Sequence, residues 1–223
     1  MTRQLAATGC RVAALARRKD KLEELTKSTP GQILPFVHDV TDYNKVPELF
    51  QEVSKALGGL DLVIYCAGIM PEVGKDEYDF SKDKAILETN LLGAIAWLDQ
   101  AAIRLGNVGK GSIVALGSVA GDRGRKGQPA YHTSKAALAT FMESLRNRLG
   151  KTGVAVVTIK PGPVETPMTA HTSFKNMMPA SKAASLILQK ADRNGEHYLS
   201  VVHRIIFFIV RNIPSPIFRK LNF

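Results

Sequence analysis

The stretch Val-Ala-Val-Val-Thr-Ile at residues 154–159 is continuous, apolar and rich in β-branched residues. Two further runs share this character, Leu-Val-Ile-Tyr-Cys at 62–66 and Ile-Val-Ala-Leu at 113–116. Short apolar runs without polar alternation are typical of strands buried on both faces of a parallel sheet. Two weaker runs, at 12–15 and 33–37, fit the same role. The sequence therefore predicts a mostly parallel sheet.

Helical patterns separate these predicted strands. They occupy residues 19–27, 43–57, 80–105, 130–149 and 181–192. Alternation of strands with helices predicts a doubly wound α/β fold, Rossmann-like, with helices on both faces of the sheet. The chain of 223 residues suits one domain, which we place at residues 1–200, followed by an apolar and basic tail at 201–223.

Composition limits the cellular setting and the class of partner. The two cysteines, Cys10 and Cys66, cannot form a disulfide framework, so a reducing, cytoplasmic location is expected. No apolar run approaches the roughly 20 residues of a spanning helix. The net charge of +10 suits anionic ligands, but no nucleic-acid motif or clustered aromatic platform accompanies it. We expect neither nucleic acid nor a metal ion as a partner.

Tyr131 and Lys135 are four residues apart on a predicted helix and therefore share one face. A cation beside a phenol favours its ionised form, which lowers the phenol pKa. Moving a tyrosine pKa from ~10 to ~7 takes roughly 4 kcal/mol and would make the side chain an acid or base near neutral pH. The alternative is a packed tyrosine beside a solvated lysine.

Further motifs follow the predicted strands in order. They are Cys-Ala-Gly at 66–68, Thr-Asn-Leu-Leu-Gly at 89–93, Gly-Ser-Val-Ala-Gly at 117–121 and Pro-Gly-Pro-Val-Glu-Thr at 161–166. Together with Tyr131 and Lys135, this ordered set resembles the short-chain dehydrogenase/reductase family over about residues 1–200. The resemblance implies an oxidoreductase that interconverts a carbonyl and an alcohol by hydride transfer, with a small-molecule substrate.

The resemblance also implies four catalytic residues. Tyr131 is the acid or base, and Lys135 lowers its pKa and holds the nicotinamide ribose. Ser118 donates a hydrogen bond to the substrate oxygen, and Asn90 positions a water that relays protons to the lysine. Taken alone, Ser118 is better explained as a serine in a turn, and Asn90 as a polar residue that satisfies helix backbone or packing.

The cofactor is predicted from the residues that follow the run at 12–15, because this run resembles the second strand of the family. An acid there would bind the ribose 2′-hydroxyl of NAD, but Ala16 takes that place and Arg17 follows. A guanidinium matches a 2′-phosphate, so NADP(H) is favoured over NAD(H), unless the basic residues only form a turn. The implied cofactor contacts are Arg17, Arg18, Asp39, Val40, Ala67, Gly68, Tyr131, Lys135, Pro161, Gly162, Val164 and Thr166. Asp39 could equally cap the following helix.

The chain opens on a helical segment at residues 2–8 instead of a strand and a Gly-rich turn. In the family, that strand is central in the sheet and its turn binds the pyrophosphate through a helix N-terminus. We therefore expect an N-terminally truncated form, with a gap in the sheet, reduced stability and weak cofactor binding. The alternative function is a non-catalytic family member that oligomerises or binds a membrane or partner.

The tail at 203–223 is apolar, with arginine and lysine at intervals and no acids. It could lie in a membrane interface as a peripheral contact, which would favour an apolar substrate. Otherwise it is a C-terminal helix that packs over the substrate pocket or against a second subunit. The helices at 80–105 and 130–149 resemble the usual subunit interface of the family, so a homodimer or tetramer is expected.

Overall fold

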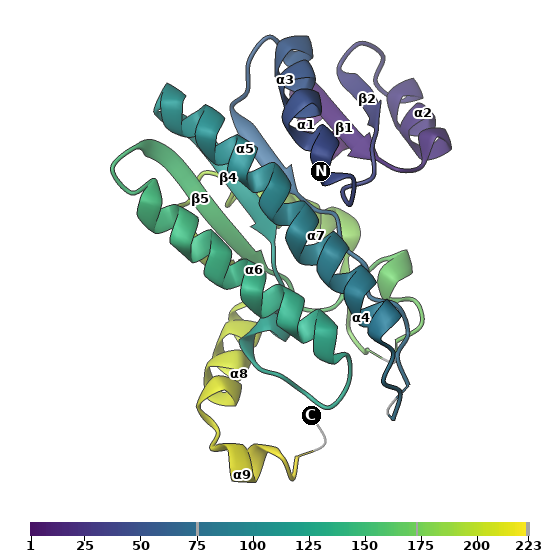
Figure 1. The fold of residues 1–223 in the computed structure, drawn as a ribbon, viewed down its shortest axis with the longest axis vertical. Coiled ribbons are helices and arrows are strands. Elements are labelled where there is room, and N and C mark those ends of the chain that lie inside the picture. The colour runs from purple at the N-terminus through teal and green to yellow at the C-terminus, as the bar shows by residue number, and fades with distance from the viewer. Residues whose placement is uncertain (75, 173, 222–223) are drawn as a thin grey trace.

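The computed structural model describes residues 1–74, 76–172 and 174–221 (Figure 1). Its strands are β1 (Val12–Ala16), β2 (Ile33–Val37), β3 (Leu62–Tyr65), β4 (Lys110–Leu116), β5 (Gly153–Lys160), β6 (Val164–Glu165), β7 (Met178–Pro179) and β8 (Gly195–Tyr198). Its α-helices are α1 (Thr2–Ala7), α2 (Lys19–Lys27), α3 (Val46–Leu57), α4 (Phe80–Leu87), α5 (Gly93–Val108), α6 (Pro129–Arg148), α7 (Ala180–Leu188), α8 (Val201–Asn212) and α9 (Ser215–Phe218). Short 3₁₀ and π turns are η1 (Tyr43–Lys45), η2 (Glu88–Leu92), η3 (Val119–Asp122) and η4 (Pro167–Thr169).

The main sheet has the order β3-β4-β5-β8 and all its pairs are parallel. Helices α5 and α6 cross one face (Figure 1), where Leu98 and Leu138 belong to the same buried cluster as Ile113. Helix α7 covers the other face, where Ile187 packs with Val157. The fully buried branched residues of β4 and β5 explain why the sequence predicted these strands well, and the doubly wound α/β class is confirmed.

Strand β1 is not joined to the main sheet. Among the described residues, β1 pairs only with β2, and β3 pairs only with β4. No backbone hydrogen-bond ladder therefore joins β1 to β3. The gap that the sequence predicted is therefore present. The β1–β2 sheet has a small core of its own, in which Ala6 of α1 and Leu22 of α2 pack on Ala14.

The predicted helix at 80–105 is interrupted. Helix α4 ends at Leu87, the π turn η2 follows, and α5 begins at Gly93. Asn90 lies in the π turn, and its side chain bonds the backbone of Ile69 in the loop after β3. A π turn inserts one residue into the helical register, which a periodicity argument does not detect.

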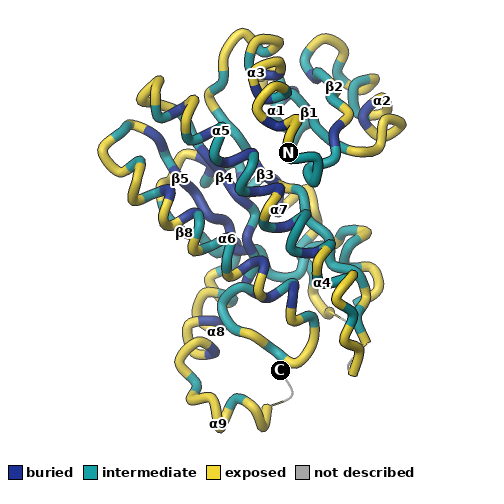
Figure 2. Tube along the Cα trace, in the orientation of Figure 1, coloured by how far each residue is buried: buried dark blue, intermediate teal, exposed yellow. Residues whose placement is uncertain are grey.

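Strand β8 was not predicted, because its sequence Gly-Glu-His-Tyr lacks an apolar run. It lies at the edge of the main sheet, where a strand needs less apolar surface. The tail forms α8 and α9, which project from the end of the molecule opposite β1 and β2 (Figure 2). Its last residues, Asn222 and Phe223, lie outside the described part of the chain. Within that part, no helix combines the length and apolar character needed to cross a membrane.

Candidate active site

Ser118 lies two residues after the end of β4 and immediately before the turn η3. Its Oγ accepts a hydrogen bond from Ala120 N at 3.0 Å. The turn lies tightly against α6, because a Cβ on Gly121 would sit 2.8 Å from the carbonyl carbon and oxygen of Lys135. Glycine at this position therefore allows Ser118 to approach the helix that carries Tyr131 and Lys135.

Lys135 is 6% exposed, and its Nζ donates to the carbonyl of Leu116 at 2.9 Å. The same Nζ lies 5.7 Å from the ring centroid of Tyr131. The two side chains therefore share one face of α6, as the spacing predicted. One turn away, the buried His132 places Nδ1 2.8 Å from Ala120 O and so holds η3 against α6. No sequence pattern pointed to His132, since its role depends on a loop that packs only in the folded chain.

Burial raises the pKa of Tyr131 above its ordinary value, and a hydrogen bond with Ser118 and the charge of Arg125 oppose that rise. Lys135 is not among the groups that shift the Tyr131 pKa here, so a lowering of this pKa by Lys135 stays a prediction. Burial also lowers the pKa of Lys135 itself, to about 8, which weakens its hold on a proton. The sequence did not point to Arg125, whose charge acts on the Tyr131 phenol, because it stands in a basic loop that resembles a solvated surface.

Asn90 joins the loop after β3 to α6. Its Oδ1 accepts from Ile69 N at 2.7 Å, and its Nδ2 donates to Ile69 O at 2.9 Å and to Ser134 Oγ at 3.3 Å. A Cβ on Gly68 would lie 3.3 Å from Asn90 Oδ1 and 3.8 Å from Lys135 Nζ. The Ala67–Gly68 backbone thus forms a cradle beside both polar groups, which suits the close approach of a flat ring or a ribose.

The residues predicted for the adenosine end lie on the separate β1–β2 sheet. Arg17 and Arg18 follow β1, with the Arg17 side chain largely exposed, and Arg17 Nη1 lies 3.7 Å from Asp39 Oδ2 after β2. Asp39 Oδ1 accepts from the N and Oγ1 of Thr41, at 3.0 and 2.8 Å, and the backbone bond is the main reason its pKa is lowered. Asp39 therefore closes a local turn and does not cap a helix, since Asp42 precedes η1.

Val40 follows β2 and packs against the main buried cluster. A Cβ on Gly93, the first residue of α5, would be 2.8 Å from Val40 O and 2.9 Å from the Tyr65 hydroxyl. The chain after β2 therefore runs close over the start of α5, and only glycine admits this approach. Val40 remains a prediction for cofactor contact.

The loop after β5 lies beside the serine turn, because Val119 N donates to Pro161 O at 3.1 Å. Thr166 caps η4, with its Oγ1 3.2 Å from Thr169 Oγ1. A cavity of about 200 Å³ opens at this loop, and its lining residues are Gly162, Pro163, Val164, Asn176, Met178, Leu199, Ser200 and His203. Tyr131 and Lys135 do not line this cavity. His203 reaches it from α8, a contribution that the sequence did not predict.

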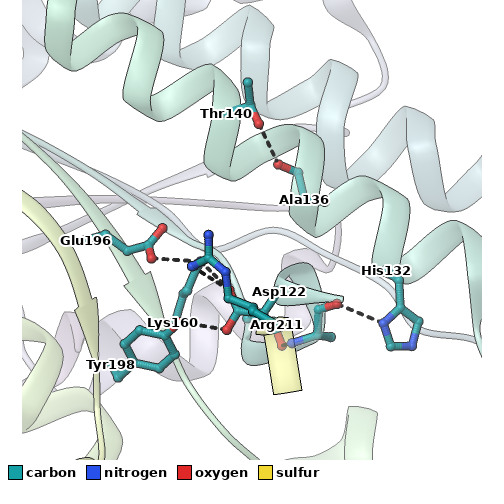
Figure 3. A network of polar contacts seen from close by, with 10 residues as sticks. Asp122, His132, Ala136, Thr140, Lys160, Glu196, Tyr198 and Arg211 are labelled. Atoms are coloured by element: carbon teal, nitrogen blue, oxygen red, sulfur yellow. Dashed lines mark hydrogen bonds and ion pairs between the residues drawn. The ribbon is translucent and has the colours of Figure 1, made fainter. Parts of the chain in front are cut away.

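A buried charge cluster lies behind the serine turn (Figure 3). The fully buried carboxylate of Asp122 lies 2.5 Å from Lys160 Nζ, accepts from the Tyr198 hydroxyl at 2.7 Å, and is 3.9 Å from Arg211. Lys160 also contacts Glu196 at 2.8 Å. The cluster joins η3, β5, β8 and α8, so it fixes the two site loops relative to the tail.

The model of the short chain dehydrogenase family matches residues 1–176. The chain belongs to this family. An uncharacterized oxidoreductase of Mycobacterium tuberculosis is 35% identical over 185 residues, which cover 80% of this chain and 73% of the relative. An uncharacterized oxidoreductase of Myxococcus xanthus is 36% identical over 173 residues, covering 76% and 68%. The short-chain dehydrogenase is thus an oxidoreductase enzyme.

Solved structures agree on the fold of this short-chain dehydrogenase. A short-chain dehydrogenase from Streptomyces avermitilis superposes with a TM-score of 0.82 at 21% identity, covering 93% of this chain and 85% of its own. The solved structure of ElxO with NADP bound gives a TM-score of 0.80 at 19% identity, covering 91% and 92%. The Rossmann-like architecture expected from the sequence is confirmed.

Proposed function

We propose that this short-chain dehydrogenase is an NADP(H)-dependent oxidoreductase that interconverts a carbonyl and an alcohol, with Tyr131 as the acid or base. The observation that carries the proposal is the convergence of three strand-end loops on α6. Ser118 lies close enough to Tyr131 to shift the phenol pKa, Lys135 Nζ donates to Leu116 O, and Asn90 lies beside Lys135 across Gly68. When bound, the nicotinamide cofactor would supply or accept the hydride.

The chain's own residues handle the proton and the substrate oxygen. A carbonyl that gains hydride develops negative charge on oxygen, which the Ser118 hydroxyl and the Tyr131 phenol can stabilise as hydrogen-bond donors. The raised pKa keeps the phenol protonated near neutral pH, the form that an acid needs for carbonyl reduction. Lys135 and Asn90 would replace the proton through water.

The residues fit the two ends of a nicotinamide dinucleotide. Gly68, beside Asn90 and Lys135, offers a cradle for the nicotinamide ribose, and Arg17 and Arg18 suit a 2′-phosphate. The sequence contains no Gly-rich turn before a helix that would hold the pyrophosphate. The similar ElxO structure holds NADP, and this likeness favours NADP(H).

An NADPH fluorescence titration tests the proposal. It compares this chain with a version that carries an added upstream strand and Gly-rich turn. We expect the extended version to bind more tightly and to reduce apolar aldehydes or ketones, as followed by loss of nicotinamide absorbance. Tyr131→Phe in the extended version should abolish turnover and leave NADPH binding intact. Unchanged turnover in this variant would contradict the catalytic assignment.

We also infer a homodimer or tetramer. Large apolar side chains remain exposed in the segment formed by η2 and α5, namely Leu92, Ile103 and Val108. Exposed apolar residues on a helix favour a contact. Light scattering should give a mass above that of the 24.3 kDa chain, and Ile103→Asp should lower it.

A further inference from the structure

Helix α8 presents its apolar side to solvent. Only Phe207 and Val210 are buried, in a cluster with Val119 of the serine turn. The exposed side carries six apolar residues with exposed fractions from 39% to 74%, namely Val201, Val202, Ile205, Ile206, Phe208 and Ile209. This apolar face is continuous, because residues 201, 205 and 208 and residues 202, 206 and 209 each follow helical spacing.

Cations border the apolar face. Arg204 and Arg211 lie seven residues apart, on the side of the helix between the apolar face and the buried face. Arg204 is exposed and makes no ion pair with any described residue. No acidic residue follows Glu196 in the sequence, whereas Arg219 and Lys220 add positive charge just after α9. The projecting segment α8–α9 is therefore apolar and positive, the combination found in helices that lie on anionic membranes.

A basic groove adjoins α9. It has a volume of about 270 Å³, and its lining residues are Gly124, Arg125, Lys126, Phe218, Arg219 and Leu221. Arg123 from the same loop lies with its guanidinium carbon 4.2 Å from the Phe218 ring centroid, which holds α9 against the loop. Three cations with two apolar side chains suit a phosphate head group whose acyl chains continue into apolar surroundings.

From these observations we propose that the apolar face of α8, with the cations around it, docks on the surface of an anionic lipid bilayer. Charge favours a bilayer over a second copy of the chain. A two-fold contact through this face would bring Arg204 and Arg211 of both copies together, and each chain carries a net charge of +10. An anionic bilayer instead pairs the exposed Arg204 while it buries the apolar side chains.

Docking would bring the bilayer close to the serine turn. Helix α8 packs directly on Val119, the residue after Ser118, and Arg123 Nη1 donates to the carbonyls of Val210 and Ile213 at its C-terminal end. A carbonyl compound dissolved in the bilayer would then be delivered beside the catalytic residues. This consequence for the substrate depends on the proposed oxidoreductase reaction, whereas the docking itself does not.

Vesicle sedimentation of the full chain tests the docking. We expect binding to vesicles of phosphatidylcholine mixed with phosphatidylglycerol, weak binding to pure phosphatidylcholine, and loss of binding as salt rises. Phe208→Asp should weaken the binding about tenfold, because it removes one large apolar side chain from the contact. Phe80→Asp is the matched control, since Phe80 is 80% exposed on α4, outside the α8–α9 segment, and this variant should bind as the unchanged chain does.

Two further variants separate the apolar and the charged contributions. Arg204→Glu should weaken binding to the anionic vesicles about tenfold and leave the weak binding to pure phosphatidylcholine unchanged. Phe208→Trp should shift its fluorescence to shorter wavelength with anionic vesicles but not with soluble glycerol phosphate. The native Trp97 is 7% exposed and supplies a constant background.

Three results would overturn the proposal. One is equal sedimentation of the unchanged chain with and without anionic lipid. Another is equal vesicle affinity of the Phe208→Asp and Phe80→Asp variants. The third is absence of vesicle binding together with an oligomer that Phe208→Asp dissociates, which would assign the face to a second copy. Circular dichroism of each variant confirms that its fold is retained.

Discussion

Asp122 and Lys160 form a buried ion pair, 2.5 Å between oxygen and nitrogen, that joins the turn after Ser118 to the end of β5 just before Pro161. Both side chains are nearly inaccessible, with exposed fractions of 0% and 4%. The pair therefore holds the substrate-side loop and the loop predicted to contact the nicotinamide in one relative position.

Removing Lys160 should destabilise the fold. Lys160→Met leaves the Asp122 carboxylate buried without its closest cation, which costs about 3 kcal/mol of unfolding free energy. Denaturant unfolding followed by circular dichroism measures the change. Lys45→Met is the control, because it removes an exposed ion pair with Asp42 and should leave the midpoint nearly unchanged. Equal midpoints for both variants would show that the buried pair contributes no stability.

Gly121 should tolerate no side chain. A Cβ there would lie 2.8 Å from the Lys135 carbonyl, so Gly121→Ala must push the serine turn away from α6. We expect a loss of about 2 kcal/mol in stability and a lower turnover of any substrate. Gly124→Ala, three residues on, meets no atom within 4 Å and should behave as the unchanged protein in both measurements. A similar loss of stability and turnover in both variants would mean that reduced flexibility of the loop, and not a clash with Lys135, causes the loss.

Lys135 should make stability depend on pH in alkaline solution. Its pKa is about 8 in the folded chain against 10.5 unfolded, so the unfolded chain binds the proton more tightly. Unfolding free energy then rises as pH increases from about 8 to about 10.5, by a total of roughly 3 kcal/mol, and this gain is lost as pH falls back through the same range. Denaturant titrations across this range measure the slope.

Lys135→Met should abolish this slope, because methionine carries no proton to exchange. Lys55→Met, an exposed lysine on α3, is the control and should keep the slope of the unchanged chain. A slope of the same size in Lys135→Met would contradict the assignment of the titration to Lys135.

Arg17 should select the phosphorylated cofactor. Arg17→Ala removes a guanidinium that suits a 2′-phosphate, so NADPH binding should weaken about tenfold while NADH binding stays the same. Fluorescence titration with both cofactors measures the ratio. Lys19→Ala lies in the same basic run and should change neither affinity. An equal loss for NADPH and NADH would instead support the view that these residues only form a turn.

The sequence predicted best those features that depend on neighbouring residues in the chain. The apolar, β-branched runs of β4 and β5 are buried, and their composition predicted both strands. The four-residue spacing of Tyr131 and Lys135 predicted that both lie on one helix, which is α6. The pKa of Tyr131 could not be predicted this way. It depends on burial and on Arg125, which acts on the phenol from a loop that the sequence presents as solvated.

Contacts between residues far apart in the chain could not be predicted from the sequence either. Asp122 and Lys160 are far apart in the chain, and neither belongs to a motif with a physical reason for pairing. His132 stands inside the recognised motif, yet its bond to Ala120 depends on how η3 folds back. The gap beside β1 was predictable because none of the five strand-like runs in the sequence fits the first strand of the family with its Gly-rich turn.

The break between β1 and β3 separates the two ends of the proposed cofactor site. Arg17 stands on one side of it and Tyr131 on the other, and no backbone ladder among the described residues joins the two sides. Their separation rests on α3, which packs on both β1 and α5, and on Gln4 of α1, which bonds Ser181 and Ser185. Side-chain packing yields more readily than a strand ladder, so we expect the spacing between the two ends of the proposed cofactor site to adjust more easily than it would in one continuous sheet.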